Sequence, residues 1–112
     1  MILVVNKYLL GKSFRGISLW PFVVLRNKKD AQDPVFLNHE RIHLKQQMEL
    51  LVLPFYVLYI SEFLIRYFLY GNAYKAYYNI SFEREAYRNE FDLIYCKRRK
   101  FWAFREYLRL KS

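Results

Sequence analysis

The stretch Val35-Phe-Leu-Asn-His-Glu-Arg-Ile-His-Leu-Lys-Gln-Gln-Met-Glu-Leu-Leu-Val-Leu53 contains no glycine or proline, and its apolar residues follow a mostly helical spacing. It therefore predicts a helix over 35–53. This helix carries both histidines of the chain, His39 and His43. Residues four apart share one helix face, so both imidazoles can bind one metal ion. Glu40, the next residue, can reach a water molecule held by that ion.

The chain before this helix is rich in residues that form strands and turns. Ile2–Val5 is a short β-branched run, and residues 17–25 form a second strand-like stretch. Pro21 cannot donate a hydrogen bond to a sheet, so we expect this strand at a sheet edge or a bulge. The polar residues 26–34 predict a turn.

The chain after this helix predicts three more helices, over 54–70, 72–95 and 99–110. Pro54 fits the first turn of the helix that it begins. Gly71 ends that helix, and Asn72 caps the next one.

The length of 112 residues and the 54% of hydrophobic residues suit one domain with its own core. We expect an α+β fold over 1–112, in which a short N-terminal β-sheet or hairpin (1–34) packs on a mainly helical core of about four helices (35–112). The single cysteine, Cys96, excludes an internal disulfide. The apolar start of the chain is too short for a signal peptide, so we expect a cytoplasmic protein.

The formal net charge is +9. The basic residues are concentrated near the C-terminus, at Lys97, Arg98, Arg99, Lys100, Arg105, Arg109 and Lys111. A solvated helix and a membrane-surface or partner-binding helix both explain this segment. No nucleic-acid-binding motif accompanies it, which disfavours DNA or RNA as a partner.

Residues 50–70 are mostly apolar and long enough to cross a bilayer. Glu62 and Arg66 lie within them, and charges in the middle of a membrane span are costly. On a helix these two residues are four apart and can pair. We therefore weigh a buried helix against membrane contact, which could be peripheral and involve residues 50–70 or the basic C-terminus.

A zinc site needs a third protein ligand, and Glu83 is the strongest candidate. It lies in an apolar stripe of the predicted helix 72–95, and a buried carboxylate is costly unless it is paired or binds metal. Glu85 lies on a face that we expect to be wetter. The weaker candidates are Glu49, Asp92 and Cys96.

The pattern His-Glu-x-x-His at 39–43, followed by Glu-x-Glu-Ala at 83–86, resembles the gluzincin metallopeptidases. It is most similar to the catalytic core shared by the CAAX-prenyl endopeptidase type and the metallopeptidase domain of β-lactam sensor-transducers. The resemblance covers about 35–90. It implies a minimal zincin-like core that binds Zn²⁺ through His39, His43 and Glu83.

The resemblance further implies that Glu40 is the general base for hydrolysis of a peptide or protein substrate by a zinc-activated water. It also implies that a strand within 17–25 aligns the peptide by backbone pairing, although this strand could simply cover the core.

One position departs from these families, which usually carry an aspartate four residues after the glutamate ligand. Tyr87 stands there. The departure, together with the short chain, leaves open a non-catalytic zinc-binding module with a regulatory role, with or without membrane association. Tyr87 and Tyr78 are candidates for stabilising the transition state or supporting the metal ligands.

Overall fold

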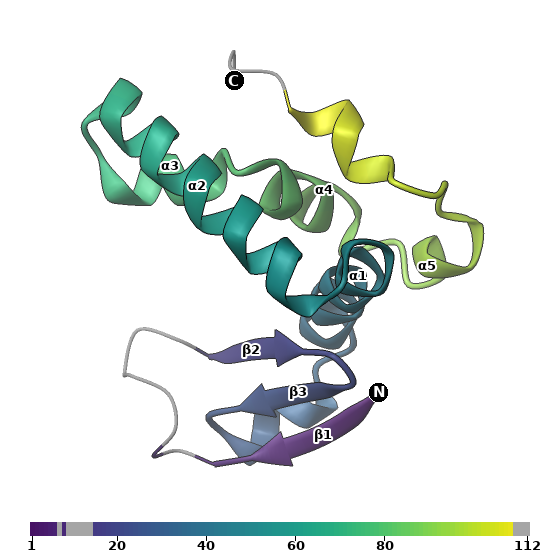
Figure 1. Ribbon diagram of the computed structural model, residues 1–112. Helices are drawn as coiled ribbons and strands as arrows, with labels where there is room; N and C mark the ends of the chain where they lie inside the picture. Colours follow the sequence, from purple (N-terminus) through teal and green to yellow (C-terminus); the bar gives the residue numbers. More distant parts are fainter. Residues whose placement is uncertain (7, 9–14, 109–112) are drawn as a thin grey trace.

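The computed structural model describes residues 1–6, 8 and 15–108 as an α+β protein, with a three-stranded sheet below a group of helices (Figure 1). The strands are β1 (Ile2–Val5), β2 (Gly16–Leu19) and β3 (Phe22–Leu25). Their order is β1-β3-β2, so β2 is an edge strand. β3 pairs parallel with β1 and antiparallel with β2, and it buries Val23 and Leu25 against the helices.

The expectation of one strand over 17–25 was wrong. Trp20 and Pro21 form the turn between β2 and β3, with Leu19 opposite Phe22. Pro21 lacks an N–H group, so a turn between two paired strands suits it better than a position within a strand.

The helical part begins with a short 3₁₀-helix, η1 (Lys28–Gln32), and the long helix α1 (Pro34–Leu50). Asp33 caps α1, because its Oδ1 accepts hydrogen bonds of 3.1 Å from the backbone N–H groups of Val35 and Phe36. α1 ends at Leu50 rather than at residue 53, because the next residue, Leu51, has a φ of 68° that does not continue a helix. The expected helix is therefore confirmed, with bounds shifted by one to three residues.

The next helix, α2 (Val52–Tyr70), contains Pro54 in its first turn, as expected. It ends at Gly71, whose φ of 67° places it in the left-handed region that favours glycine. Asn72 then caps α3 (Ala73–Tyr78) by accepting a hydrogen bond from the N–H of Lys75.

The predicted helix over 72–95 is interrupted twice, so that prediction was wrong in its extent. Asn79 ends α3 by donating to the carbonyl of Lys75 at 2.7 Å, and α4 (Ser81–Asn89) begins after Ile80. α4 ends where the buried side-chain amide of Asn38, in α1, donates hydrogen bonds to the backbone carbonyls of Asn89 and Glu90. These carbonyls therefore need no partner further along a helix.

The predicted helix over 99–110 is also wrong for the residues that the structure describes. The helix α5 (Tyr95–Arg98) ends before Arg99, and a short 3₁₀-helix, η2 (Ala103–Tyr107), follows. Arg99 has an extended backbone because its side chain is held by Glu49 and Glu85 in the interior. Residues 109–110 lie outside the described residues.

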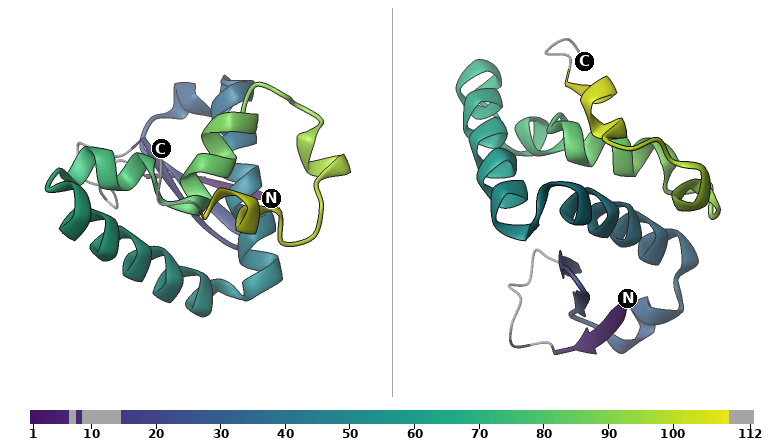
Figure 2. Two further views of the ribbon diagram at one scale, coloured as in Figure 1. Left: turned by 90° about the horizontal axis from the view of Figure 1, so that it is seen from above. Right: turned by 45° about the vertical axis from the view of Figure 1, so that its right-hand side comes forward.

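Helix α1 lies between the sheet and α4 (Figure 2, right). Its sheet side packs Leu44 on Val23 and Leu25, whereas its other side packs Ile42 on Ala86. A separate aromatic cluster joins α2, α4 and η2 through Phe55, Phe82 and Phe104. The histidine-bearing helix is therefore central to the fold.

Candidate metal centre

Three buried side chains from α1 and α4 bring their ligand atoms together. The Nε2 atoms of His39 and His43 each lie 3.1 Å from Oε1 of Glu83, and 3.2 Å from one another. Ligand atoms arranged tetrahedrally at zinc distances of about 2.0–2.2 Å lie roughly 3.3–3.5 Å apart. Among the described residues, this group alone combines three such ligands. Its geometry could hold a metal ion, and the nitrogen and carboxylate donors suit zinc among several transition metals.

Hydrogen bonds on the far side of each imidazole direct its Nε2 atom into this centre. Gln46 donates through Nε2 to the carbonyl of Phe82 and to Glu85, so its Oε1 is the atom that faces His43. A carbonyl oxygen can only accept, and Nδ1 of His43 therefore carries the proton at 2.8 Å. This tautomer leaves Nε2 of His43 free to bind metal.

His39 is oriented in the same way by a carboxylate. Its Nδ1 donates to Oε1 of Glu90 at 3.0 Å. Asn38 fixes the backbone of Glu90 through a 2.8 Å hydrogen bond to its carbonyl. A carboxylate–histidine pair of this kind orients the ring and increases the basicity of the ligand nitrogen.

The third ligand is held by a tyrosine of α2. Tyr59 donates its hydroxyl proton to Oε2 of Glu83 at 2.5 Å, which leaves Oε1 directed at the imidazoles. Burial alone would raise the pKa of Glu83, but the two histidines lower it well below its usual range. Burial would likewise lower the pKa of His43, but the charge of Glu83 raises it to about 9. The buried carboxylate thus favours positive charge at this centre, from protons or from a metal ion.

Glu40 lies beside the three ligands and is not one of them. Burial raises the pKa of its carboxyl, and the neighbouring histidines oppose this effect only in part. The nearby Ser18 side chain of β2 also acts to lower this pKa. Ser18 is in turn held by Gln47, whose Nε2 donates to the hydroxyl oxygen at 3.1 Å. This arrangement places a proton acceptor of raised pKa next to the metal centre.

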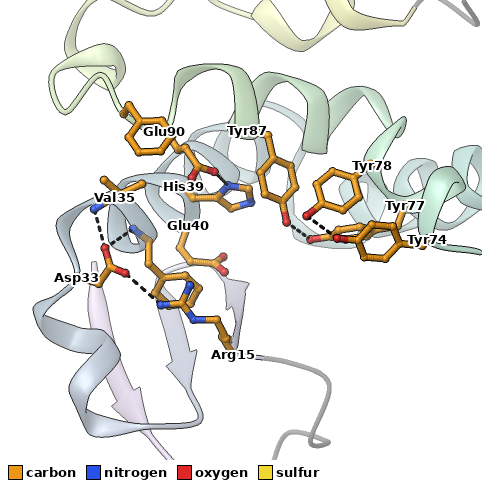
Figure 3. A pocket seen from close by; sticks show the side chains of 13 residues that line it. Arg15, Asp33, Val35, His39, Glu40, Tyr74, Tyr77, Tyr78, Tyr87 and Glu90 are labelled. Carbon is orange, nitrogen blue, oxygen red and sulfur yellow. Dashed lines mark hydrogen bonds and ion pairs between the residues drawn. The ribbon is translucent and has the colours of Figure 1, made fainter. Parts of the chain in front are cut away.

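Two cavities open onto Glu40 and His39. The larger, of about 700 Å³, lies between β2, α1 and the tyrosines of α3 and α4 (Figure 3). The smaller, of about 160 Å³, reaches His43 and Glu83 beneath α2. A bound ligand could therefore approach the metal centre and Glu40 together from the larger cavity.

Tyr87 and Tyr78 both line the larger cavity. The ring of Tyr87 packs edge-on against His39, with 4.4 Å between ring centroids, and its hydroxyl lies 3.1 Å from that of Tyr77. Tyr78 packs on Tyr87 at 4.6 Å. Tyr87 thus contacts a ligand residue, while its role in a reaction stays a prediction.

The expectation that Glu85 lies on a wetter face was wrong. Its side chain is 0% exposed and binds Arg99, Tyr95 and Gln46. The other alternative ligands also lie outside the centre. Cys96 packs beside Ile42 and Tyr95, Glu49 binds Arg99, and Asp92 pairs with Arg98.

Sequence reasoning missed Gln46, Tyr59 and Glu90. Gln46 is three residues after His43 on the same helix, and Glu90 is seven residues after Glu83, so helical spacing could have indicated both. Tyr59 carries no such signal, because α2 is placed over Glu83 only by the tertiary fold.

Comparison of the chain with protein-family models, with curated proteins and with solved structures found no match.

Proposed function

We propose that the protein is a zinc-dependent peptidase, in which His39, His43 and Glu83 hold the metal and Glu40 is the general base. The observation that carries this proposal is the convergence of two Nε2 atoms and one carboxylate oxygen beside a fourth side chain, Glu40, that binds none of them. A purely structural zinc site needs no proton acceptor at this position.

The chemistry divides between the metal and the chain. Zinc, when bound, is a Lewis acid that polarises a peptide carbonyl and acidifies water. Glu40 accepts the proton of the attacking water and passes it to the leaving amine. Burial raises the pKa of its carboxyl, which makes it a stronger proton acceptor than an exposed glutamate. Tyr59, Gln46 and Glu90 keep the ligands oriented during this transfer.

Strand β2 is the element best placed to align a peptide. It is an edge strand, and Gly16 and Ser18 line the same cavities as Glu40. An extended peptide can pair with backbone groups at a strand edge. Pairing here would use the groups around Gly16, because the Ser18 carbonyl already accepts hydrogen bonds from Gln47 and Tyr56. A Cβ atom on Gly16 would lie 2.9 Å from Phe36, so glycine allows β2 to pack closely beside the cavity.

A non-catalytic zinc-binding module is the second candidate. It is favoured by the burial of all three ligand residues, because a metal enclosed in this way can serve stability alone. Both candidate functions use the same three metal ligands. They differ in whether Glu40 accepts a proton during a reaction.

The test is hydrolysis of a mixed peptide library by the zinc-loaded protein, with the metal content measured in parallel. We expect Glu40→Gln to keep one zinc per chain and to lower the rate about 100-fold or more. Glu83→Ala should lose the metal, and exposed Glu106→Gln serves as the matched control. Bound zinc without cleavage by the unmodified protein would favour the non-catalytic module. Absence of zinc binding would overturn both candidates.

A further inference from the structure

The outer face of α2 is apolar along its length, apart from the exposed hydroxyl of Ser61. Leu53, Val57, Ile60, Leu64 and Phe68 follow one another on this face, and all of them are exposed. The helix is long and apolar enough to cross a membrane by length and composition, and only 11% of its most apolar window is buried. An apolar surface of this extent is unusual on a protein that is surrounded by water.

The charged residues of α2 are on its inner face. Arg66 is 1% exposed, pairs with Glu62 at 3.7 Å and donates to the carbonyl of Leu108. Glu62 also accepts a hydrogen bond from the backbone N–H of Ser81. Charges turned inward and apolar groups turned outward are the arrangement of a helix that faces lipid.

A basic and aromatic segment lies at the N-terminal end of α2. Glu49, at the end of α1, accepts hydrogen bonds from the backbone of Trp102 at 2.8 Å and from Arg99, which brings residues 99–102 to this end. Exposed residues around it include Lys97, Lys100, Phe101 and Arg105. At the other end of α2, the ammonium group of Lys75 lies 4.7 Å from the Tyr70 ring centroid.

Basic and aromatic side chains beside an apolar surface suit the headgroup region of an anionic bilayer. The net charge of +9 on each copy opposes pairing of two copies through this face. An anionic lipid surface instead complements the charge.

We propose that the outer face of α2 inserts into an anionic bilayer, with the helix axis lying in the plane of the membrane surface. α2 runs along one edge of the molecule, and the helices that precede and follow it, α1 and α3, both lie on its inner side (Figure 2, left). A helix connected in this way can lie on a membrane without carrying the rest of the protein across it. The inference does not rest on the metal centre.

The first experiment measures binding to vesicles of phosphatidylcholine with and without phosphatidylglycerol. We expect roughly 100-fold tighter binding to the anionic vesicles at low salt, since each of three exposed basic residues contributes about fivefold. Phe68→Ser should weaken binding about tenfold. Phe91→Ser is the matched control, because Phe91 is also exposed, at 77% against 87% for Phe68, and lies outside α2.

Failure of the unmodified protein to bind anionic vesicles would overturn the proposal. Equal losses of vesicle binding in Phe68→Ser and Phe91→Ser would also overturn it. A dimer that Phe68→Ser dissociates, in a protein that binds no vesicles, would assign this face to a second copy instead.

A second experiment tests the orientation of the helix. Single reporters are attached at Leu53→Cys, Ile60→Cys and Phe68→Cys in a Cys96→Ser background, and their depth is measured by quenching from labelled lipids. An in-plane helix places all three at one shallow depth, about 5–10 Å below the headgroups. A central reporter much deeper than the outer two would overturn the in-plane placement.

Discussion

The candidate centre depends on which nitrogen of each histidine carries its proton. Gln46 and Glu90 accept hydrogen bonds from the Nδ1 atoms of His43 and His39, and both Nε2 atoms therefore face Glu83. Glu90 is supplied by the end of α4, two helical turns after Glu83. It provides a carboxylate for the site even though Tyr87 occupies the position where the resembled families usually have one.

Replacement of Glu90 tests whether this carboxylate supports metal binding. Glu90→Gln keeps the size of the side chain and removes its charge, so the Nδ1 hydrogen bond of His39 becomes weaker. We expect zinc affinity to fall about 10–100-fold with the fold retained. Competition with a chromophoric chelator measures the affinity, and Glu106→Gln is the control. Unchanged affinity would show that Glu90 does not act through His39.

At the scale of elements, the sheet is attached to α1 by a buried glutamine. Gln47 donates to the carbonyl and the hydroxyl oxygen of Ser18, and its Oε1 accepts from the N–H of Trp20 at 2.7 Å. These bonds hold β2 and its turn next to Glu40. The position of the edge strand at the cavity therefore depends on Gln47, together with Tyr56 of α2, whose hydroxyl also donates to the Ser18 carbonyl.

We expect Gln47→Leu to lower the free energy of unfolding by about 2–3 kcal/mol, because it removes three hydrogen bonds and leaves the part-buried N–H of Trp20 without its partner. Urea unfolding monitored by circular dichroism measures this loss. Gln32→Leu, at an exposed position of η1, should change stability much less. Zinc content should stay at one per chain, because Gln46 orients His43 whereas Gln47 holds β2. Loss of zinc in Gln47→Leu would contradict this separation of roles.

At the scale of the whole molecule, a buried charge network joins the C-terminal segment to the helices. The Arg99 side chain is 3% exposed and bonds Glu49 of α1 at 2.6 Å and Glu85 of α4 at 2.5 Å. These contacts raise the pKa of the Arg99 guanidinium against the opposing effect of burial. Beyond this network the chain continues into η2, which packs on α4 on the side of the molecule away from the sheet (Figure 1).

We expect Arg99→Met to destabilise the protein by about 3–5 kcal/mol, since two carboxylates would lose their buried partner. Arg98→Met is the matched control, because Arg98 is exposed and its ion pair with Asp92 lies at the surface. Its effect should stay below about 1 kcal/mol. Thermal unfolding of both variants gives the comparison, and similar shifts for the two would contradict a special role of the buried network.

The sequence alone determined the features that depend on residues close together along the chain. The histidine spacing and the uninterrupted apolar pattern predicted α1 and its metal-binding face, and Pro54 and Gly71 marked the two ends of α2. The apolar stripe around Glu83 predicted its burial. Local spacing is sufficient for these features because one helix turn decides which side chains share a face.

Tertiary structure decided the rest, because it depends on partners distant in sequence. Asn38 ends α4 through carbonyls more than 50 residues away, and Arg99 is drawn inward by Glu49, 50 residues earlier. Tyr59 reaches Glu83 only because α2 folds over the centre. No local pattern encodes such pairs, since buried polar groups take the partners that packing brings to them. For the same reason, only the fold could show that the charges of α2 face inward and its apolar residues face outward.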